Sequence, residues 1–145
     1  MAFRALWNEA VMLKRLLQMG VQTIMLPNSR NREVVEAAVA AVRYPPRGIR
    51  GVSGNSRSNR FGRIKDYFDK ADDHICLIAQ IETQMGKDNV EEIAAVDGID
   101  CLFVGPADLA ADLGYLGKNT NPTPQAAMKD VIERTVKAGC AAGIL

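Results

Sequence analysis

The sequence has few of the residues that build the commonest catalytic and metal sites. It contains a single histidine, His74, and three cysteines, none of them in a Cys-x-x-Cys spacing. The sequence therefore offers too few cysteines and histidines for a Cys/His nucleophilic pair, a zinc site or a disulfide framework. Each cysteine lies in or beside an apolar run, which predicts a buried free thiol, and the polar surroundings of His74 predict a solvated side chain.

An excess of one charge and long hydrophobic runs are also absent. The 18 Lys and Arg residues against 17 Asp and Glu residues leave a formal net charge of +1, which favours neither nucleic acid nor a membrane surface as a partner. The apolar runs are too short to cross a bilayer, and the opening Met-Ala-Phe-Arg lacks the apolar core of a secretory signal. We expect no membrane or nucleic-acid partner and a cytoplasmic location.

Short apolar runs alternate with stripes of period 3.6, a pattern typical of βα units. The runs predict strands at residues 2–6, 21–26, 75–82, 99–105 and 140–145. The stripes predict a first helix at 8–19, which carries Val11, Met12, Leu16 and Met19. They also predict helices at 29–43, at about 64–71, after a capping box of Asp88 and Glu91, and from the cap Thr123 to Ala138. A short helical turn is expected at 109–113.

The predicted strands are too apolar to face water on either side, which favours a parallel sheet covered by its crossover helices. The repeat length fits a (β/α)8 barrel, but five strands do not close one. We therefore expect a partial (β/α)8 TIM barrel, with residues 1–145 forming an incomplete domain that lacks the first strands and the C-terminal end. A doubly wound open sheet is the competing architecture, although no Gly-x-Gly-x-x-Gly follows any predicted strand.

Two acidic residues fall at the carboxyl ends of consecutive predicted strands. Glu82 ends "ICLIAQIE", and Asp108 follows "IDCLFVG" after a Gly105-Pro106 turn. Loops at these strand ends converge, so the two carboxylates can share a hard cation such as Mg²⁺ or Mn²⁺. Alternatively, Asp108 caps the short helix at 109–113 and Glu82 is a solvated strand terminus. The turn before Asp108 also offers backbone amides that can hold a carboxylate.

Four motifs in order carry a family resemblance: "RYPPRGIRGV" at 43–52, "RFGRI" at 60–64, "QIET" at 80–83 and "GPADLAADLG" at 105–114. Together they resemble the HpcH/HpaI aldolase family, the class II pyruvate aldolases. The resemblance implies a carbon-carbon lyase that cleaves a 4-hydroxy-2-keto acid to pyruvate and an aldehyde, with a divalent cation (Mg²⁺, Mn²⁺ or Co²⁺). It also implies a homo-oligomer.

Carried over by position, the resemblance implies that Glu82 and Asp108 bind the metal. It places Arg4 at the pyruvate keto oxygen and Gln80 beside the glutamate ligand, and it assigns the pyruvate carboxylate to the amides of Ala107 and Asp108. The family's catalytic histidine precedes the Arg4 strand, and His74 does not match it. A Schiff-base mechanism is disfavoured because all seven lysines map to helices or loops.

Two other hypotheses remain open. The arginine-rich segment 43–63 offers charge for phosphate or RNA, but only Tyr44 and Phe61 for stacking. We expect it instead to be a structured loop over the active site, with its arginines paired or solvated. The chain is alternatively an inactive fragment of such an aldolase, in which uncovered sheet edges favour self-association.

Overall fold

The structure is a computed structural model that describes residues 2–145. Its centre is one sheet of five parallel strands: β1 (Ala2–Arg4), β2 (Thr23–Leu26), β3 (Cys76–Ile81), β4 (Cys101–Val104) and β5 (Ala141–Ile144). The strands pair in chain order, so each lies beside the one before it. This order never reverses, unlike that of a doubly wound sheet, and the competing architecture is therefore wrong.

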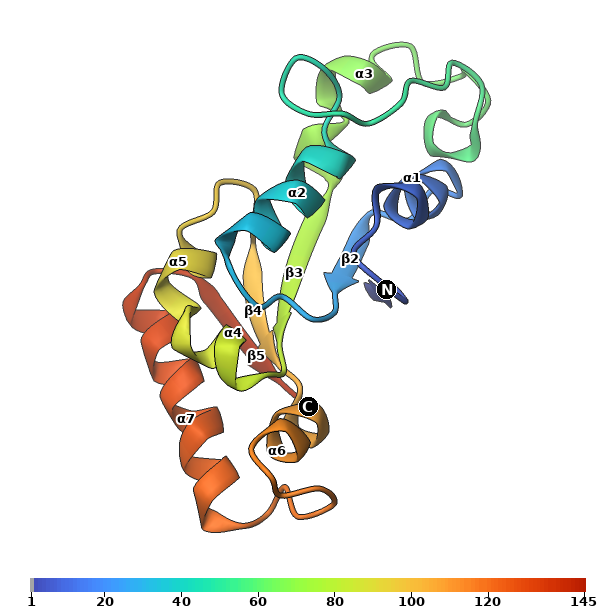
Figure 1. The fold of residues 1–145 in the computed structure, drawn as a ribbon. Coiled ribbons are helices and arrows are strands. Elements are labelled where there is room, and N and C mark those ends of the chain that lie inside the picture. Colours follow the sequence, from blue (N-terminus) through green and yellow to red (C-terminus); the bar gives the residue numbers. More distant parts are fainter. Residues whose placement is uncertain (1) are drawn as a thin grey trace.

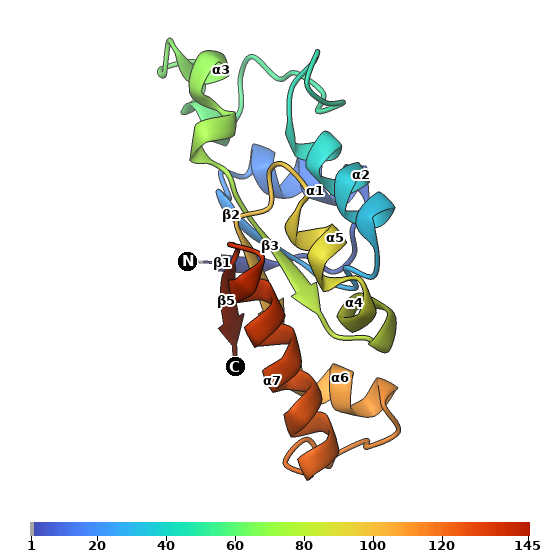
Figure 2. The ribbon, with the colours of Figure 1, turned by 90° about the vertical axis from the view of Figure 1, so that its left-hand side faces the viewer.

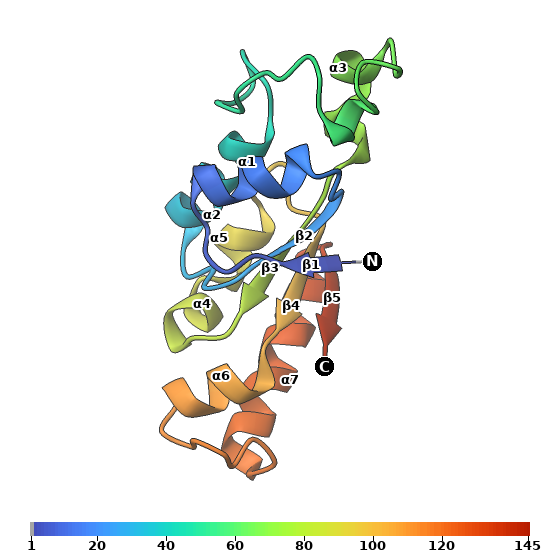
Figure 3. The same ribbon diagram turned by 90° about the vertical axis from the view of Figure 1, so that its right-hand side faces the viewer.

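Helices connect the strands: α1 (Ala10–Gln18), α2 (Arg32–Val42), α3 (Tyr67–Lys70), α4 (Gln84–Asp88), α5 (Val90–Ala94), α6 (Pro106–Asp112) and α7 (Pro122–Lys137) (Figure 1). Two 3₁₀ turns, η1 (Arg57–Asn59) and η2 (Asp72–His74), lie between α2 and β3. The side views in Figures 2 and 3 place α1, α2, α5 and α7 on one side of the sheet. Within residues 2–145, no helix has both the length and the apolarity to cross a membrane.

The hydrophobic core lies between the sheet and this helical layer. Strand side chains alternate in direction, and those facing the helices are at most 2% exposed: Ile24, Leu26, Leu77, Ala79, Ile81, Leu102 and Val104. Apolar side chains on the other face, such as Met25, Ile78, Cys101 and Phe103, are only half-buried. The sequence predicted strands covered on both sides, whereas the described residues cover one side. The open face is the one that would line a barrel.

The predicted capping box of Asp88 and Glu91 is wrong. The helix is divided there: α4 ends at Asp88 and α5 begins at Val90. The cap that forms is Thr83, whose side-chain oxygen accepts a hydrogen bond from the amide of Gly86 at 3.1 Å. Glu91 instead pairs with Arg134 across the helical layer. A tertiary ion pair therefore takes the side chain that the local pattern assigned to a cap.

Two other local predictions differ from the structure. Helix α7 begins at Pro122 after the cap Asn121, two residues before the start expected from Thr123. Of the stripe expected on the first helix, Leu16 is buried, but Val11 and Met19 are 68% and 56% exposed; the buried side chains of α1 are Leu13, Leu16 and Leu17. Both errors shift an element or its face without altering the order of elements.

Candidate active site

Polar side chains meet at the carboxyl end of the sheet. Arg4 is the last residue of β1, Gln80 and Glu82 lie on and just after β3, and Asp108 lies in the first turn of α6. Because Leu77, Ala79 and Ile81 face the helices, the period of two directs Gln80 and Glu82 to the open face. The two carboxylates predicted from the sequence therefore reach the same end of the sheet.

The guanidinium of Arg4 joins the other three side chains. Its Nε donates to Gln80 Oε1 at 2.7 Å, and its Nη2 donates to Glu82 Oε2 at 3.2 Å. The same Nη2 lies 3.9 Å from Asp108 Oδ2. One nitrogen atom thus lies within ion-pair distance of both carboxylates, so Glu82 and Asp108 point into one space.

Glu82 is a buried acid rather than a solvated strand terminus. It is 7% exposed, and its Oε1 accepts a hydrogen bond from the backbone amide of Asn28 at 2.7 Å. Burial raises the pKa of Glu82, and the neighbouring Asp108 carboxyl raises it further. The Asn28 amide and Arg4 oppose this rise. The alternative in which Glu82 is merely solvated is wrong.

Asn28 is a site residue that the sequence reasoning missed. It follows Pro27 directly after β2 and adopts φ 55°, a left-handed conformation that non-glycine residues adopt at a cost. This conformation directs its amide toward Glu82. The sequence did contain a signal for this turn, namely an asparagine after a proline at the carboxyl end of a buried strand. Asn adopts the left-handed region more readily than most other residues.

The turn between β4 and α6 approaches Gln80 and Glu82 closely at Gly105. A Cβ built there would lie 2.6 Å from Gln80 Nε2 and 3.2 Å from Glu82 Oε2. Gly105 is also the residue that precedes α6, so the alternative in which Asp108 caps this helix is wrong. The first intrahelical backbone bond runs from the Leu109 amide to the Gly105 carbonyl. The earlier amides of the turn are free of intrahelical acceptors.

The donor set suits a hard divalent cation. Arg4, Asn28, Glu82, Thr83, Asp108, Ala111 and Asp112 line an open depression of about 410 Å³. Within residues 2–145, no three His, Cys, Asp or Glu side chains gather to hold a metal. Glu82 and Asp108 thus offer two carboxylate groups, and Mg²⁺ commonly binds through one or two carboxylates plus water and substrate.

The arginine-rich segment does not cover this depression. The connection from α2 to β3 lies at the amino end of the sheet, so the expectation of a loop over the active site is wrong (Figure 1). Connections from helix to strand return to the amino ends of parallel strands, whereas those from strand to helix lie at the carboxyl ends. Arg43 and Arg47 pair with Asp97 and Asp72, and Arg50 is buried.

Other side chains agree with the sequence analysis. The lysines all lie outside the strands, and His74 is exposed. The three cysteines are free, as expected, but they are half-buried rather than fully buried, and burial raises the pKa of each thiol. The ionisable groups that meet at the carboxyl end of the sheet are therefore Glu82, Asp108 and Arg4.

A singly wound parallel sheet with two carboxylates at its strand ends defines a barrel-type α/β segment. Residues 4–145 match the family model of HpcH/HpaI aldolase/citrate lyase, and the chain belongs to this family. It is 48% identical over 139 residues to a hydroxypyruvate/pyruvate aldolase of Sagittula stellata, covering 96% of this chain and 55% of that protein. A pyruvate aldolase of Rhizobium etli is 49% identical over 138 residues, covering 95% and 54%.

Solved structures share the fold. A family member from Burkholderia cenocepacia superposes with a TM-score of 0.95 at 41% identity, covering 99% of this chain and 57% of that one. An HpcH/HpaI aldolase from Desulfitobacterium hafniense gives a TM-score of 0.88 at 29% identity, covering 99% and 56%. The chain therefore spans about half the length of the relatives it matches.

Proposed function

We propose that the chain provides the metal- and pyruvate-binding half of a class II aldolase, which cleaves a 4-hydroxy-2-keto acid to pyruvate and an aldehyde. The observation that carries this proposal is the shared position of Glu82 and Asp108 on either side of Arg4 Nη2. The similarity to enzymes named hydroxypyruvate/pyruvate aldolase and 5-keto-4-deoxy-D-glucarate aldolase supports it. No observation favours the inactive-fragment or RNA-binding alternative.

Glu82 and Asp108 would hold the divalent cation, Mg²⁺, Mn²⁺ or Co²⁺. When bound, such a cation acts as a Lewis acid toward the enolate oxygen that retro-aldol cleavage produces. Glu82 suits this role because the Asn28 amide orients one of its oxygens, while the other lies near Asp108 and Arg4. Asp108 is exposed at the depression, so its carboxylate is accessible to an ion from solvent.

Arg4 would donate to the keto oxygen as negative charge develops there during cleavage. A fixed donor stabilises a developing oxyanion without reorganising in the transition state. Gln80 is 5% exposed and accepts from Arg4 Nε, so it fixes the plane of the guanidinium. The amides of Ala107 and Asp108 would hold the substrate carboxylate, since both precede the first intrahelical donor of α6.

The wider context follows from this proposal. The partner is a small 2-keto acid, with no role for nucleic acid or a membrane, and the enzyme acts as a homo-oligomer in the cytoplasm.

The test combines metal binding with product release. Mn²⁺ binding is measured by isothermal titration in the wild type, Glu82→Ala and Asp108→Ala, with the exposed Glu92→Ala as the matched control. We expect binding to be lost in both site variants and kept in the control. Pyruvate release from a 4-hydroxy-2-keto acid should stop when a chelator is added. Unchanged metal affinity in both site variants would overturn the proposal.

A further inference from the structure

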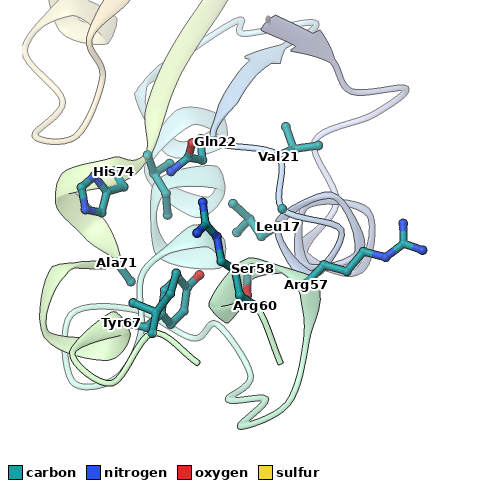
Figure 4. A pocket seen from close by; sticks show the side chains of 12 residues that line it. Leu17, Val21, Gln22, Arg57, Ser58, Arg60, Tyr67, Ala71 and His74 are labelled. Atoms are coloured by element: carbon teal, nitrogen blue, oxygen red, sulfur yellow. The ribbon is translucent and has the colours of Figure 1, made fainter. Parts of the chain in front are cut away.

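A second cavity, of about 240 Å³, lies at the other end of the sheet (Figure 4). Among its lining residues, Gln22 directly precedes β2 and Ile75 directly precedes β3. Arg4 and Glu82 lie at the opposite, carboxyl ends of the strands. The cavity is therefore separate from the depression around the carboxylates, and the proposed aldolase function makes no use of it.

The lining combines an apolar wall with polar and cationic groups. Its apolar members are Leu17, Val21, Ile64, Ala71 and Ile75, and its polar members are Gln22, Ser58, Tyr67, His74, Arg57 and Arg60. Within the described part of the chain, no acidic residue lines it. A cavity with positive but no negative side chains favours an anion, and the apolar wall favours one with a carbon skeleton.

Arg60 is the cation directed into this space. Figure 4 shows its guanidinium extending into the cavity toward Gln22, whereas Arg57 points away. Over residues 2–145, neither arginine has a carboxylate within ion-pair distance, in contrast to Arg43 and Arg47 of the same segment. The charge of Arg60 is thus available to a ligand.

The segment around Arg60 is held in a conformation that costs free energy. Arg60 and Phe61 adopt φ 50° and 58°, the left-handed region, which costs about 1 kcal/mol or more for each such residue. The side chain of Asn59, 2% exposed, holds the turn: its Oδ1 accepts from the Gly62 amide at 3.0 Å and its Nδ2 donates to the Gly54 carbonyl at 2.8 Å. A buried hydrogen-bonded residue thereby sets the direction of Arg60.

The opposite wall is also held in place. Arg50, 2% exposed, donates from Nη2 to the Tyr67 hydroxyl at 2.8 Å and lies 4.3 Å from the centroid of the Tyr44 ring. The Tyr67 hydroxyl accepts this bond and keeps its own proton to donate. The cavity therefore has walls that are positioned by buried contacts before any ligand arrives.

We propose that this cavity binds a small organic anion, a carboxylate or phosphate monoester with a short carbon skeleton, with Arg60 as its counter-ion. Gln22 and Ser58 supply hydrogen bonds beside the charge, and the apolar wall contacts the carbon skeleton. The size of the cavity suits a single metabolite-sized molecule rather than a polymer. A ligand there contacts the starts of β2 and β3 together and stabilises their pairing.

The test is a titration of the chain followed by ¹H–¹⁵N NMR. The probes are inorganic phosphate, glycerol 3-phosphate and succinate, and RNA is represented by oligouridylate. We expect saturable shifts at the Gln22 and Ser58 amides and at the Arg60 Nε. Tighter binding of glycerol 3-phosphate would identify the ligand as a phosphate monoester, and tighter binding of succinate would identify it as a carboxylate. No saturable shift with any small anion, or tighter binding of oligouridylate than of all three, would overturn the proposal.

Matched variants separate this site from general charge. Arg60→Gln should weaken binding about tenfold, the usual effect of losing a charge-assisted hydrogen bond. Arg63→Gln removes an exposed arginine of the same segment that does not line the cavity, and should leave binding unchanged. Arg60→Gly removes the guanidinium but suits the left-handed backbone, so binding should fall while the melting temperature holds. Equal weakening in Arg63→Gln would contradict the assignment.

Discussion

At the scale of single residues, the candidate active site depends on how closely the backbone approaches its polar side chains. Gly105 has an ordinary negative φ of −94°, so its lack of a side chain matters for space rather than for backbone freedom. Gln80, which the missing Cβ would contact, is buried and holds Arg4. The geometry of the guanidinium between the two carboxylates is therefore coupled to Gln80, an uncharged residue on β3.

We predict that Gly105→Ala displaces the Gln80 amide and, through it, Arg4. Inserting one carbon into a filled site costs about 1–3 kcal/mol, and the displacement should also weaken Mn²⁺ binding or pyruvate release. The control is Gly54→Ala, because a Cβ at Gly54 meets no atom within 4 Å. Chemical denaturation and metal titration measure the two effects. Equal stability and metal affinity for both variants would show that the close approach has no role.

At the scale of elements, Arg134 of α7 connects the helices that cover β3 and β4. It donates to both carboxylate oxygens of Glu91, from Nε to Oε1 at 2.7 Å and from Nη2 to Oε2 at 2.5 Å. It also donates to the carbonyls of Lys87 and Asp88 at 2.8 and 3.2 Å. These carbonyls belong to the last turn of α4, whose C-terminal acceptors otherwise lack donors. The Arg134 side chain thus caps the C-terminal end of α4 and links α7 to both α4 and α5.

Arg134→Met should destabilise the chain in a pH-dependent way. The Arg134 guanidinium lowers the pKa of Glu91 to about 2 in the folded chain, from 4.5. A lowered folded pKa contributes stability above the unfolded pKa, and this contribution is lost as pH falls from 4.5 toward 2. Because Glu91 is largely exposed, the pair itself contributes about 1 kcal/mol or less, and the lost carbonyl bonds add to it.

Urea denaturation at several pH values measures this difference. Lys137→Met, at the exposed end of the same helix, is the control and should change stability little. We expect the gap between Arg134→Met and wild type to be larger at pH 7 than below the folded pKa of Glu91. A gap that is independent of pH would show that the ion pair contributes nothing.

At the scale of the whole molecule, one face of the sheet has no covering layer among residues 2–145. Met25, Ile78, Cys101 and Phe103 lie half-buried there, and β1 and β5 are edge strands with unpaired backbone groups. Exposed apolar faces and parallel sheet edges are sites of association. The face of the sheet that packs against the helices is buried as in a closed domain, whereas the apolar side chains of the other face are partly exposed.

We predict that the 145-residue chain self-associates. Gel filtration with light scattering should give a species larger than the 15.8 kDa monomer. Phe103→Lys on the open face should shift the population toward monomer because it adds charge to the association surface, whereas Val11→Lys at a 68% exposed position of α1 should not. A monodisperse wild-type monomer that melts cooperatively would contradict this prediction.

The order of elements and the carboxylate pair followed from the amino-acid sequence. Apolar runs alternating with helical stripes specify βα units. Glu82 ends one of those runs and Asp108 lies just after the next, so their meeting at one edge is a consequence of parallel topology. Local signals failed where a tertiary contact competed for the same side chain. Glu91, which the local pattern assigned to a helix cap, pairs with Arg134 of α7 instead.

Other features required the three-dimensional structure. The left-handed turn that directs the Asn28 amide to Glu82 and the approach of Gly105 to Gln80 depend on packing between segments far apart in the chain. The arginine-rich segment is a different case, because its position at the amino end of the sheet follows from its place between a helix and the next strand. Sequence patterns record which side chains must be buried and where strands end. Distances between side chains on different strands are decided only when the sheet forms and its neighbours compete for the same space.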